Sequence, residues 1–115
     1  MSIQHRVDAA EPSILAWLEA WYESACDGDW EHQNGFEINS LDNPGWHVQI
    51  TWITGSKNTP DEQWEVITKR DASDDDWIVC RVTQGCFDGV GDPRKLREIL
   101  RLFRSWWTSN RLTVR

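Results

Sequence analysis

The sequence contains no stretch that would hold the protein in a membrane or direct it through one. No run approaches the roughly 18 apolar residues of a membrane span. The segment from Met1 to Glu11 also lacks the apolar core of a secretory signal. We therefore expect a cytoplasmic protein. Its 115 residues fit one domain, residues 1–115, with a core from about residue 12 to residue 109.

Cysteine is scarce and unevenly spaced. Cys26, Cys80 and Cys86 form an odd number without paired spacing, which argues against a disulfide framework and fits a reducing cytosol. The sequence has no Cys-x-x-Cys or His-x-x-x-His pair of the kind that zinc requires. We predict neither a metal site nor a cofactor.

Positive charge is nearly missing from the first four-fifths of the chain. Residues 1–92 carry 5 Lys and Arg against 18 Asp and Glu, a net charge of −13. Residues 93–115 carry 7 against 1, a net charge of +6. Nucleic acid phosphates would be repelled by the acidic part, which argues against nucleic acid as the main partner. The acidic part favours a basic protein partner, including a nuclease with a positive groove.

Tryptophan is the abundant residue, with nine copies. Each indole can bury roughly 150–250 Å², so several of them would enlarge the core of a small domain. We expect most of the nine to be core residues and one or two to lie at a binding surface, where tryptophan is enriched.

The spacing of apolar residues predicts an α+β fold. A four-stranded antiparallel sheet is flanked by an N-terminal and a C-terminal helix, because the connections are too short for crossover helices. Gly85 to Asp92, with three glycines, is expected to be a loop. The helices are predicted over residues 12–25 and 92–109, and the strands over residues 36–39, 46–53, 63–69 and 77–83.

Several details of these elements are also predicted. Asp92 is the expected N-cap of the last helix, with Pro93 in its first position. Val66 and Trp64 are expected to point inward, and residues 71–76 to form an acidic hairpin loop. The apolar run over residues 77–83 predicts a strand that is buried on both faces.

One stretch, Cys26-Asp27-Gly28-Asp29-Trp30-Glu31-His32, mixes three carboxylates with a thiol, an indole and an imidazole. Its alternate acids resemble the opening of a calcium loop, but His32 and Ile38 stand where that loop needs Gly and Glu. The stretch is either a structural corner, with Asp27 or Asp29 capping backbone N–H groups, or a recognition surface.

Blocks along nearly the whole chain resemble one protein family. Together, over about residues 12–107, they are similar to the immunity protein 53 family of bacterial polymorphic toxin systems. The blocks are Leu15-Ala16-Trp17-Leu18, Trp21-Tyr22, Cys26-Asp27-Gly28-Asp29-Trp30-Glu31-His32, Leu41-Asp42-Asn43-Pro44-Gly45-Trp46, Asp76-Trp77 and Gly91-Asp92-Pro93.

This resemblance implies an α+β immunity protein that is made beside a toxin and neutralises it by binding. It supplies no set of contact residues, so we take these from the sequence. A basic toxin would meet carboxylates and aromatic groups. The candidates are Asp27, Asp29, Trp30, Glu31, His32, Glu37, Asp42, Asp74, Asp75 and Asp76.

Two other functions remain as alternatives. A small enzyme would use Cys26 as a nucleophile with His32 or His47 as its base, although no oxyanion donor can be identified. The nearby carboxylates and the negative helix end disfavour a thiolate there. A nucleic-acid-associated accessory domain would use the arginine stripe of the last helix, which otherwise forms salt bridges to the acidic body or is solvated. This stripe contains Arg94, Arg97, Arg101 and Arg104.

Overall fold

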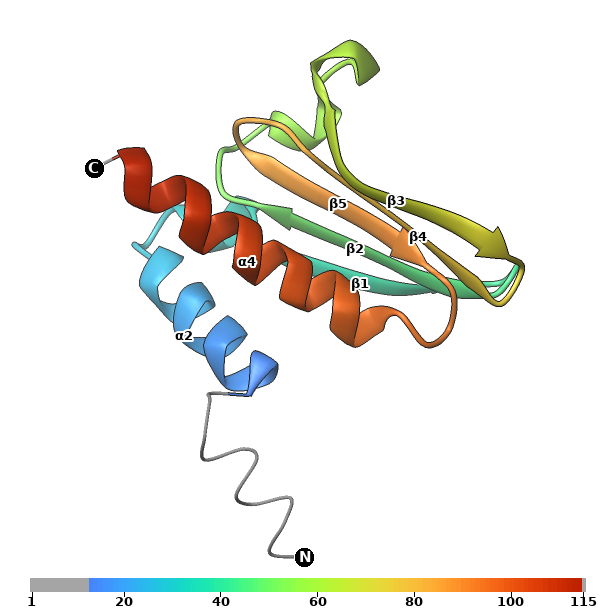
Figure 1. Ribbon diagram of the computed structural model, residues 1–115. Coiled ribbons are helices and arrows are strands. Elements are labelled where there is room, and N and C mark those ends of the chain that lie inside the picture. The colour runs from blue at the N-terminus through green and yellow to red at the C-terminus, as the bar shows by residue number, and fades with distance from the viewer. Residues whose placement is uncertain (1–12, 115) are drawn as a thin grey trace, which may run out of the picture.

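An antiparallel sheet forms one layer of the protein, and two helices, α2 and α4, cover one of its faces (Figure 1). The computed structural model describes residues 13–114, and side chains for residues 13–110. The strand order is β1-β2-β5-β4-β3, with every neighbouring pair antiparallel. The α+β class is therefore confirmed. The elements are α2 (Ile14–Ala25), α3 (Trp30–Gln33), α4 (Leu96–Val114), β1 (Phe36–Leu41), β2 (Gly45–Thr51), β3 (Glu65–Ser73), β4 (Asp76–Val82), β5 (Cys86–Gly91) and the 3₁₀ helices η1 (Ser56–Asn58) and η2 (Asp61–Gln63).

The sheet has five strands, so the prediction of four was wrong. The missed strand, β5, is the central one and lies in the segment that was expected to be a loop. Its glycines hide the alternation, yet they have a packing role. A Cβ atom at Gly89 would lie 2.6 Å from Cγ2 of Ile99 on α4. The helix can therefore approach β5 only because that position has no side chain.

The start of α4 also differs from its prediction. The helix begins at Leu96, three residues after Pro93, and it extends to Val114. Asp92 lies too far before Leu96 to be the N-cap of α4, so that prediction was wrong. At the other end of the fold, α2 begins after Ser13, whose hydroxyl accepts the N–H of Ala16 at 3.0 Å. The predicted first turn at Pro12 lies outside the described residues.

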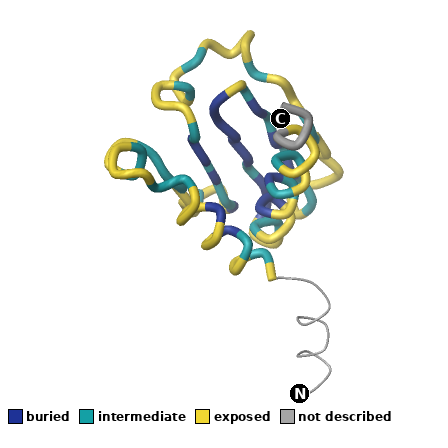
Figure 2. The backbone as a smooth tube through the Cα atoms, turned by 90° about the vertical axis from the view of Figure 1, so that its left-hand side faces the viewer, coloured by how far each residue is buried: buried dark blue, intermediate teal, exposed yellow. Residues whose placement is uncertain are grey.

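The core between the helices and the sheet is aromatic. Phe103 on α4 is fully buried, and Trp21 on α2 is 6% exposed. Their ring centroids lie 5.4 Å apart in an edge-on arrangement. Figure 2 shows buried backbone concentrated in the central strands and on the inner sides of the helices. All nine tryptophans are buried or half-buried, which confirms that most are core residues.

The two faces of the sheet differ in what covers them. Ile78, Cys80 and Val82 on β4 point toward the helices and are buried, whereas Val79 and Arg81 point away and are half-buried. The prediction that β4 is buried on both faces was therefore wrong. We call the side away from the helices the open face of the sheet.

Strand β3 departs most from its expected shape. The pairing register shifts between Val66 and Thr68 and again between Asp71 and Ser73. Val66 is 55% exposed rather than inward, because it pairs with Arg81 and so shares the open face with that side chain. Trp64, two residues earlier, was also expected to point inward but lies against Arg81 instead of in the core. The expected hairpin loop shrinks to Asp74 and Asp75, since β3 continues to Ser73.

Candidate functional site

The corner after α2 uses two of its three carboxylates to hold its own backbone. An oxygen of Asp27 accepts the N–H groups of Asp29 and Trp30, both at 2.9 Å. The carboxylate of Glu31 accepts the N–H groups of Asp27 at 3.0 Å and Gly28 at 2.9 Å. The N–H of Trp30, followed by that of Asp29, lowers the pKa of Asp27. Backbone N–H groups, led by its own, likewise lower the pKa of Glu31.

Trp30 anchors this corner to the sheet. Its indole N–H donates to the backbone oxygen of Thr51 at 3.1 Å, and its ring meets Trp21 with centroids 5.8 Å apart. The side chains of Asp29 and His32 are exposed instead. The stretch is therefore a built corner that also presents two solvated polar groups.

The thiol and the imidazoles of the alternative enzyme are not brought together. The backbone N–H of Cys26 caps the end of α2. The charge of the Cys26 side chain, followed by its hydrogen bond, raises the pKa of Tyr22. No hydrogen bond within the described residues joins Cys26 to His32 or to His47. His47 instead contacts Asp88, with Nε2 and Oδ1 2.6 Å apart.

The other two cysteines are buried thiols. Burial raises the pKa of Cys80 to about 12, and it also raises the pKa of Cys86. Both are fully covered, so neither offers an accessible thiolate at neutral pH.

Glu37, another predicted contact residue, pairs with Lys57 at 2.9 Å on the open face. The pair lies in a groove of about 380 Å³ between the start of β1 and the loop that contains η1. Its charge is therefore compensated within the molecule.

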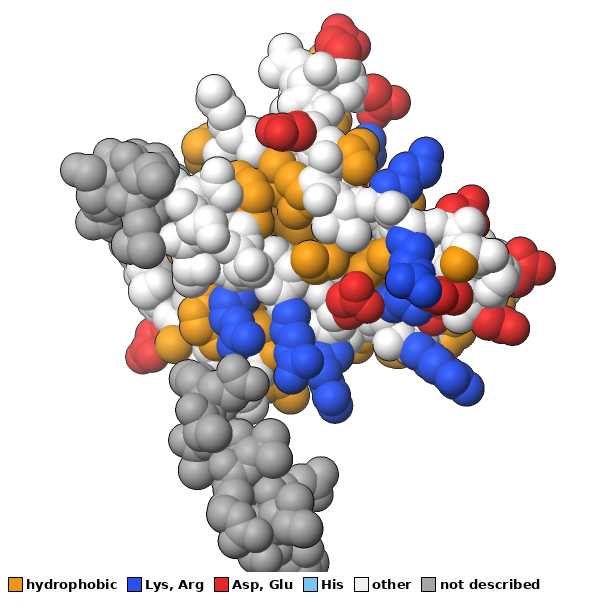
Figure 3. All heavy atoms as spheres, in the orientation of Figure 1, with side chains coloured by type: hydrophobic (Ala, Val, Ile, Leu, Met, Phe, Trp, Pro, Cys, Tyr) orange, Lys and Arg blue, Asp and Glu red, His pale blue; other side chains and the backbone are white. Residues whose placement is uncertain are grey.

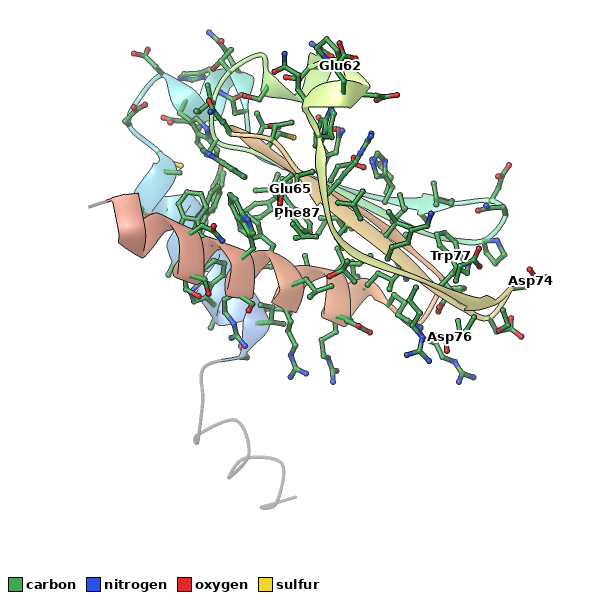
Figure 4. All side chains as sticks on the ribbon, turned by 45° about the horizontal axis from the view of Figure 1, so that its top comes forward. Glu62, Glu65, Asp74, Asp76, Trp77 and Phe87 are labelled. Atoms are coloured by element: carbon green, nitrogen blue, oxygen red, sulfur yellow. The ribbon has the colours of Figure 1, made fainter. Side chains whose placement is uncertain are left out.

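The remaining acidic candidates lie at the opposite end of the sheet. Asp42 is in the β1–β2 turn, and Asp74 and Asp75 form the β3–β4 turn. All three are exposed, and none forms an ion pair within the described residues. The two turns share one end because Trp46 and Ile78 both pair with Gly91. Figure 4 shows Asp74 at the tip of this end.

Asp76, beside this tip, is part of the scaffold. Its oxygens meet Arg70 at 2.6 Å and Lys95 at 3.0 Å. Hydrogen bonds from Arg70 and then Lys95 lower the pKa of Asp76. Lys95 also contacts Asp92 at 2.7 Å, so one ammonium group joins β4 to the segment before α4.

Asp92 is the fully buried centre of this junction. It accepts the backbone N–H of Trp77 at 2.9 Å and that of Arg94 at 2.8 Å. Burial opposes its ionisation, but Lys95 and these N–H groups prevail and lower the pKa to about 2. Asp92 therefore fixes the path from β5 into α4.

The L-D-N-P-G-W block meets the same junction. The indole N–H of Trp46 donates to the backbone oxygen of Pro93 at 2.9 Å. A side chain at Gly45 would collide with the backbone oxygen of Gly91 and would lie 3.3 Å from the ring of Trp77. Three blocks that are separate in the sequence thus form one structural unit.

The predicted contact residues consequently do not form one surface. The corner candidates, residues 27–32, precede β1. The candidates in and beside the turns, Asp42 and residues 74–76, lie at the far end of the sheet. The seven residues of β2 between them span about 20 Å at roughly 3.3 Å per residue.

Sequence reasoning missed a polar row on the open face. Asp88 is only 7% exposed, and its second oxygen lies 3.4 Å from Nε of Arg81. The Arg81 guanidinium also contacts Asp61 at 3.4 Å and stacks over Trp64, 4.5 Å from the ring centroid. Recognition of β5 as a strand would have found this row, because Phe87 then points inward and Asp88 outward.

The arginine stripe of α4 is mostly solvated. Arg94, Arg97 and Arg101 form no ion pair within the described residues, whereas Arg104 has an interaction partner. Figure 3 shows Lys and Arg side chains along α4 and acidic side chains at the tip of the sheet. The protein is thus electrically asymmetric on this face.

The family model described as Immunity protein 53 matches residues 15–108, which includes both ends of the sheet and most of α4. No curated protein and no solved structure matches the chain. In the described part of the chain, no helix is long and apolar enough to span a bilayer.

Proposed function

This chain belongs to the immunity protein 53 family, and on that basis we propose that it binds and neutralises a cognate bacterial toxin. The protein acts in the cytoplasm, stoichiometrically, and by covering the toxin's active site. The single observation that carries this proposal is the match of the family model over residues 15–108.

We propose the acidic tip, defined as Asp42, Asp74 and Asp75, as the first contact with the toxin. The fold gives these three carboxylates no structural task within the described residues, unlike Asp76 beside them. Exposed charges without partners add little to stability, but they attract an oppositely charged protein. A basic toxin, such as a nuclease, is the partner that this charge fits.

The corner supplies a second, smaller set of contacts in this proposal. Asp29 and His32 are solvated there, while Asp27, Trp30 and Glu31 position them by holding the backbone. The separation of about 20 Å along β2 means that one toxin surface must be broad to reach both ends. Glu37 contributes least, because Lys57 already compensates it.

Neutralisation in this proposal requires no bond-making by the protein. Steric cover of an active site uses surface shape and charge alone. The capping role of Cys26, the burial of the other two thiols and the engagement of His47 with Asp88 support this view.

Co-purification with the toxin encoded beside this protein tests the proposal. Tagged wild-type protein should retain the toxin in a 1:1 complex and protect cells that express it. Absence of a complex at micromolar concentrations would contradict the proposal. A triple Asp42→Asn, Asp74→Asn, Asp75→Asn variant should associate with the toxin more slowly than the wild type. The difference in association rate should be larger at low salt, because ions screen the electrostatic attraction.

The arginine stripe favours one second candidate, weak association with nucleic acid. Arg97 and Arg101 lie on α4 and Arg94 lies two residues before it, and none of the three has an ion pair within the described residues. Phosphate binding would weaken steeply as salt rises. Titration with a labelled oligonucleotide at low salt tests it, and absence of binding there rejects it.

A further inference from the structure

The two edges of the sheet are protected very differently. The β3 edge has two register shifts and carries the charged side chains of Lys69, Arg70 and Asp71. Bulges and charges are the common means by which proteins prevent pairing at an edge. The β1 edge has neither bulge nor proline, and its six residues pair with β2 in unbroken register.

The outward backbone groups of β1 can be identified. Thr51 donates its N–H to the oxygen of Gly35, so these two residues form a hydrogen-bonded pair. In an antiparallel ladder such pairs alternate, and the residues between them turn their N–H and C=O groups to the outside. Those outward residues are Phe36, Ile38 and Ser40.

The same edge also exposes apolar surface. Ile38 is 44% exposed and lies on the helix side, two residues beyond Phe36. On α2, Tyr22 is 41% exposed, and its ring centroid is 6.2 Å from that of Phe36. The unpaired edge is thus accompanied by two uncovered apolar side chains.

Charge indicates which occupant fits this edge. Glu37 is the one ionisable residue of β1, and Lys57 compensates it. The edge is therefore close to neutral on a molecule with a net charge of −7. A basic partner would be attracted to the acidic tip instead, whereas a second acidic copy can approach here with least repulsion.

We propose that β1 pairs antiparallel with β1 of a second copy of this chain, about a two-fold axis at Ile38. This arrangement places Ile38 opposite the partner's Ile38 and Phe36 opposite the partner's Ser40. Glu37 then faces the partner's Asn39, so no like charges oppose each other. The outward N–H and C=O groups become paired, and the sheet continues across both copies with the helices on one side.

Sedimentation equilibrium on the full chain tests this inference, which does not rest on the proposed function. The wild-type mass should rise from 13.5 kDa toward twice that value as concentration increases to hundreds of micromolar. Ile38→Lys places two ammonium groups in opposition and should weaken association by about tenfold or more. Val66→Lys, at the similarly exposed β3 position, is the matched control and should leave association unchanged.

A second variant tests the predicted register. Ser40→Pro removes an N–H that faces outward rather than toward β2, and proline is tolerated at such edge positions. It should also weaken association while far-UV circular dichroism stays native. A wild type that remains monomeric throughout, or equal loss in Val66→Lys, would overturn the inference. Loss of toxin binding in Ile38→Lys with a monomeric wild type would also overturn it, by assigning the edge to the toxin.

Discussion

The two faces of one sheet have opposite compositions. On the helix side, Phe87 and Phe103 are fully buried, with ring centroids 5.3 Å apart, and seven tryptophans join the same core. On the open face, the central contacts are polar, from His47 through Asp88 to Arg81. Strand alternation alone produces this separation, because neighbouring residues of β5 point to opposite faces.

The difference separates residues that the fold requires from residues that it does not. Removing a buried ring leaves a cavity, whereas changing a solvated carboxylate changes mainly what the surface attracts. The unfolding free energy should therefore change most for substitutions on the helix side, and toxin binding should change most for substitutions at the acidic tip. The predictions below test that division, in order of decreasing effect.

Truncation of the central ring should have the largest effect. Phe103→Ala removes a fully buried side chain and should lower the unfolding free energy by about 3–5 kcal/mol. Urea denaturation measures this loss. A loss below that of the open-face variant Arg81→Gln would contradict the assignment of stability to the helix side.

A single added methyl group on the same side should come next. Gly89→Ala places a Cβ atom too close to Ile99 and to the sulfur of Cys80, which lie 2.6 Å and 3.1 Å from it. Overpacking of this kind costs about 1–3 kcal/mol. Gly55→Ala is not a fair control because Gly55 has a positive φ of 90°, so Ser105→Ala on the exposed side of α4 serves instead.

Acid should weaken the junction that Asp92 forms between β4 and the segment before α4. Asp92 has a pKa of about 2 in the folded protein, below its usual 3.8, so the unfolded chain binds more protons in that range. Its contribution to stability is present above about pH 4 and is lost as the pH falls toward 2. Unfolding curves at several pH values should show this decline, and Asp92→Asn should flatten it.

Loss of the open-face guanidinium should have a smaller effect. Arg81→Gln removes the stacking on Trp64 and two ion pairs from a side chain that is 35% exposed. The expected loss is about 1 kcal/mol, since partly solvated pairs and cation–π contacts contribute modestly. Thermal unfolding measures it. A loss as large as that of Phe103→Ala would erase the proposed difference between the faces.

The sequence predicted the elements whose periodicity is regular. Val48 and Ile50 on β2 alternate with polar residues and are fully buried, as expected. The long apolar stripe of α4 was recognised for the same reason. β5 could not be recognised, because glycine is needed at positions 89 and 91, where a side chain would collide with Ile99 or Lys95. Those positions therefore lack the apolar side chains whose alternation would indicate a strand.

The candidate site was predictable only in part. Capping by Asp27 follows from local chemistry, and the structure confirms it. The role of Asp92 was missed because its remote partner, the backbone N–H of Trp77, lies on β4 and is brought to it by the pairing of β4 with β5; Lys95, its other partner, is only three residues away. The same register unites the two acidic turns, which no local pattern of residues encodes.

The most direct test of the proposed division compares two equal changes in charge. Asp74→Asn with Asp75→Asn alters the acidic tip, and Glu19→Gln with Glu23→Gln alters the exposed side of α2. Both pairs should change the unfolding free energy by no more than about 0.5 kcal/mol. Stopped-flow mixing with the cognate toxin should show slower association for the tip variant alone. Equal association rates for the two variants would contradict the assignment of recognition to the acidic tip.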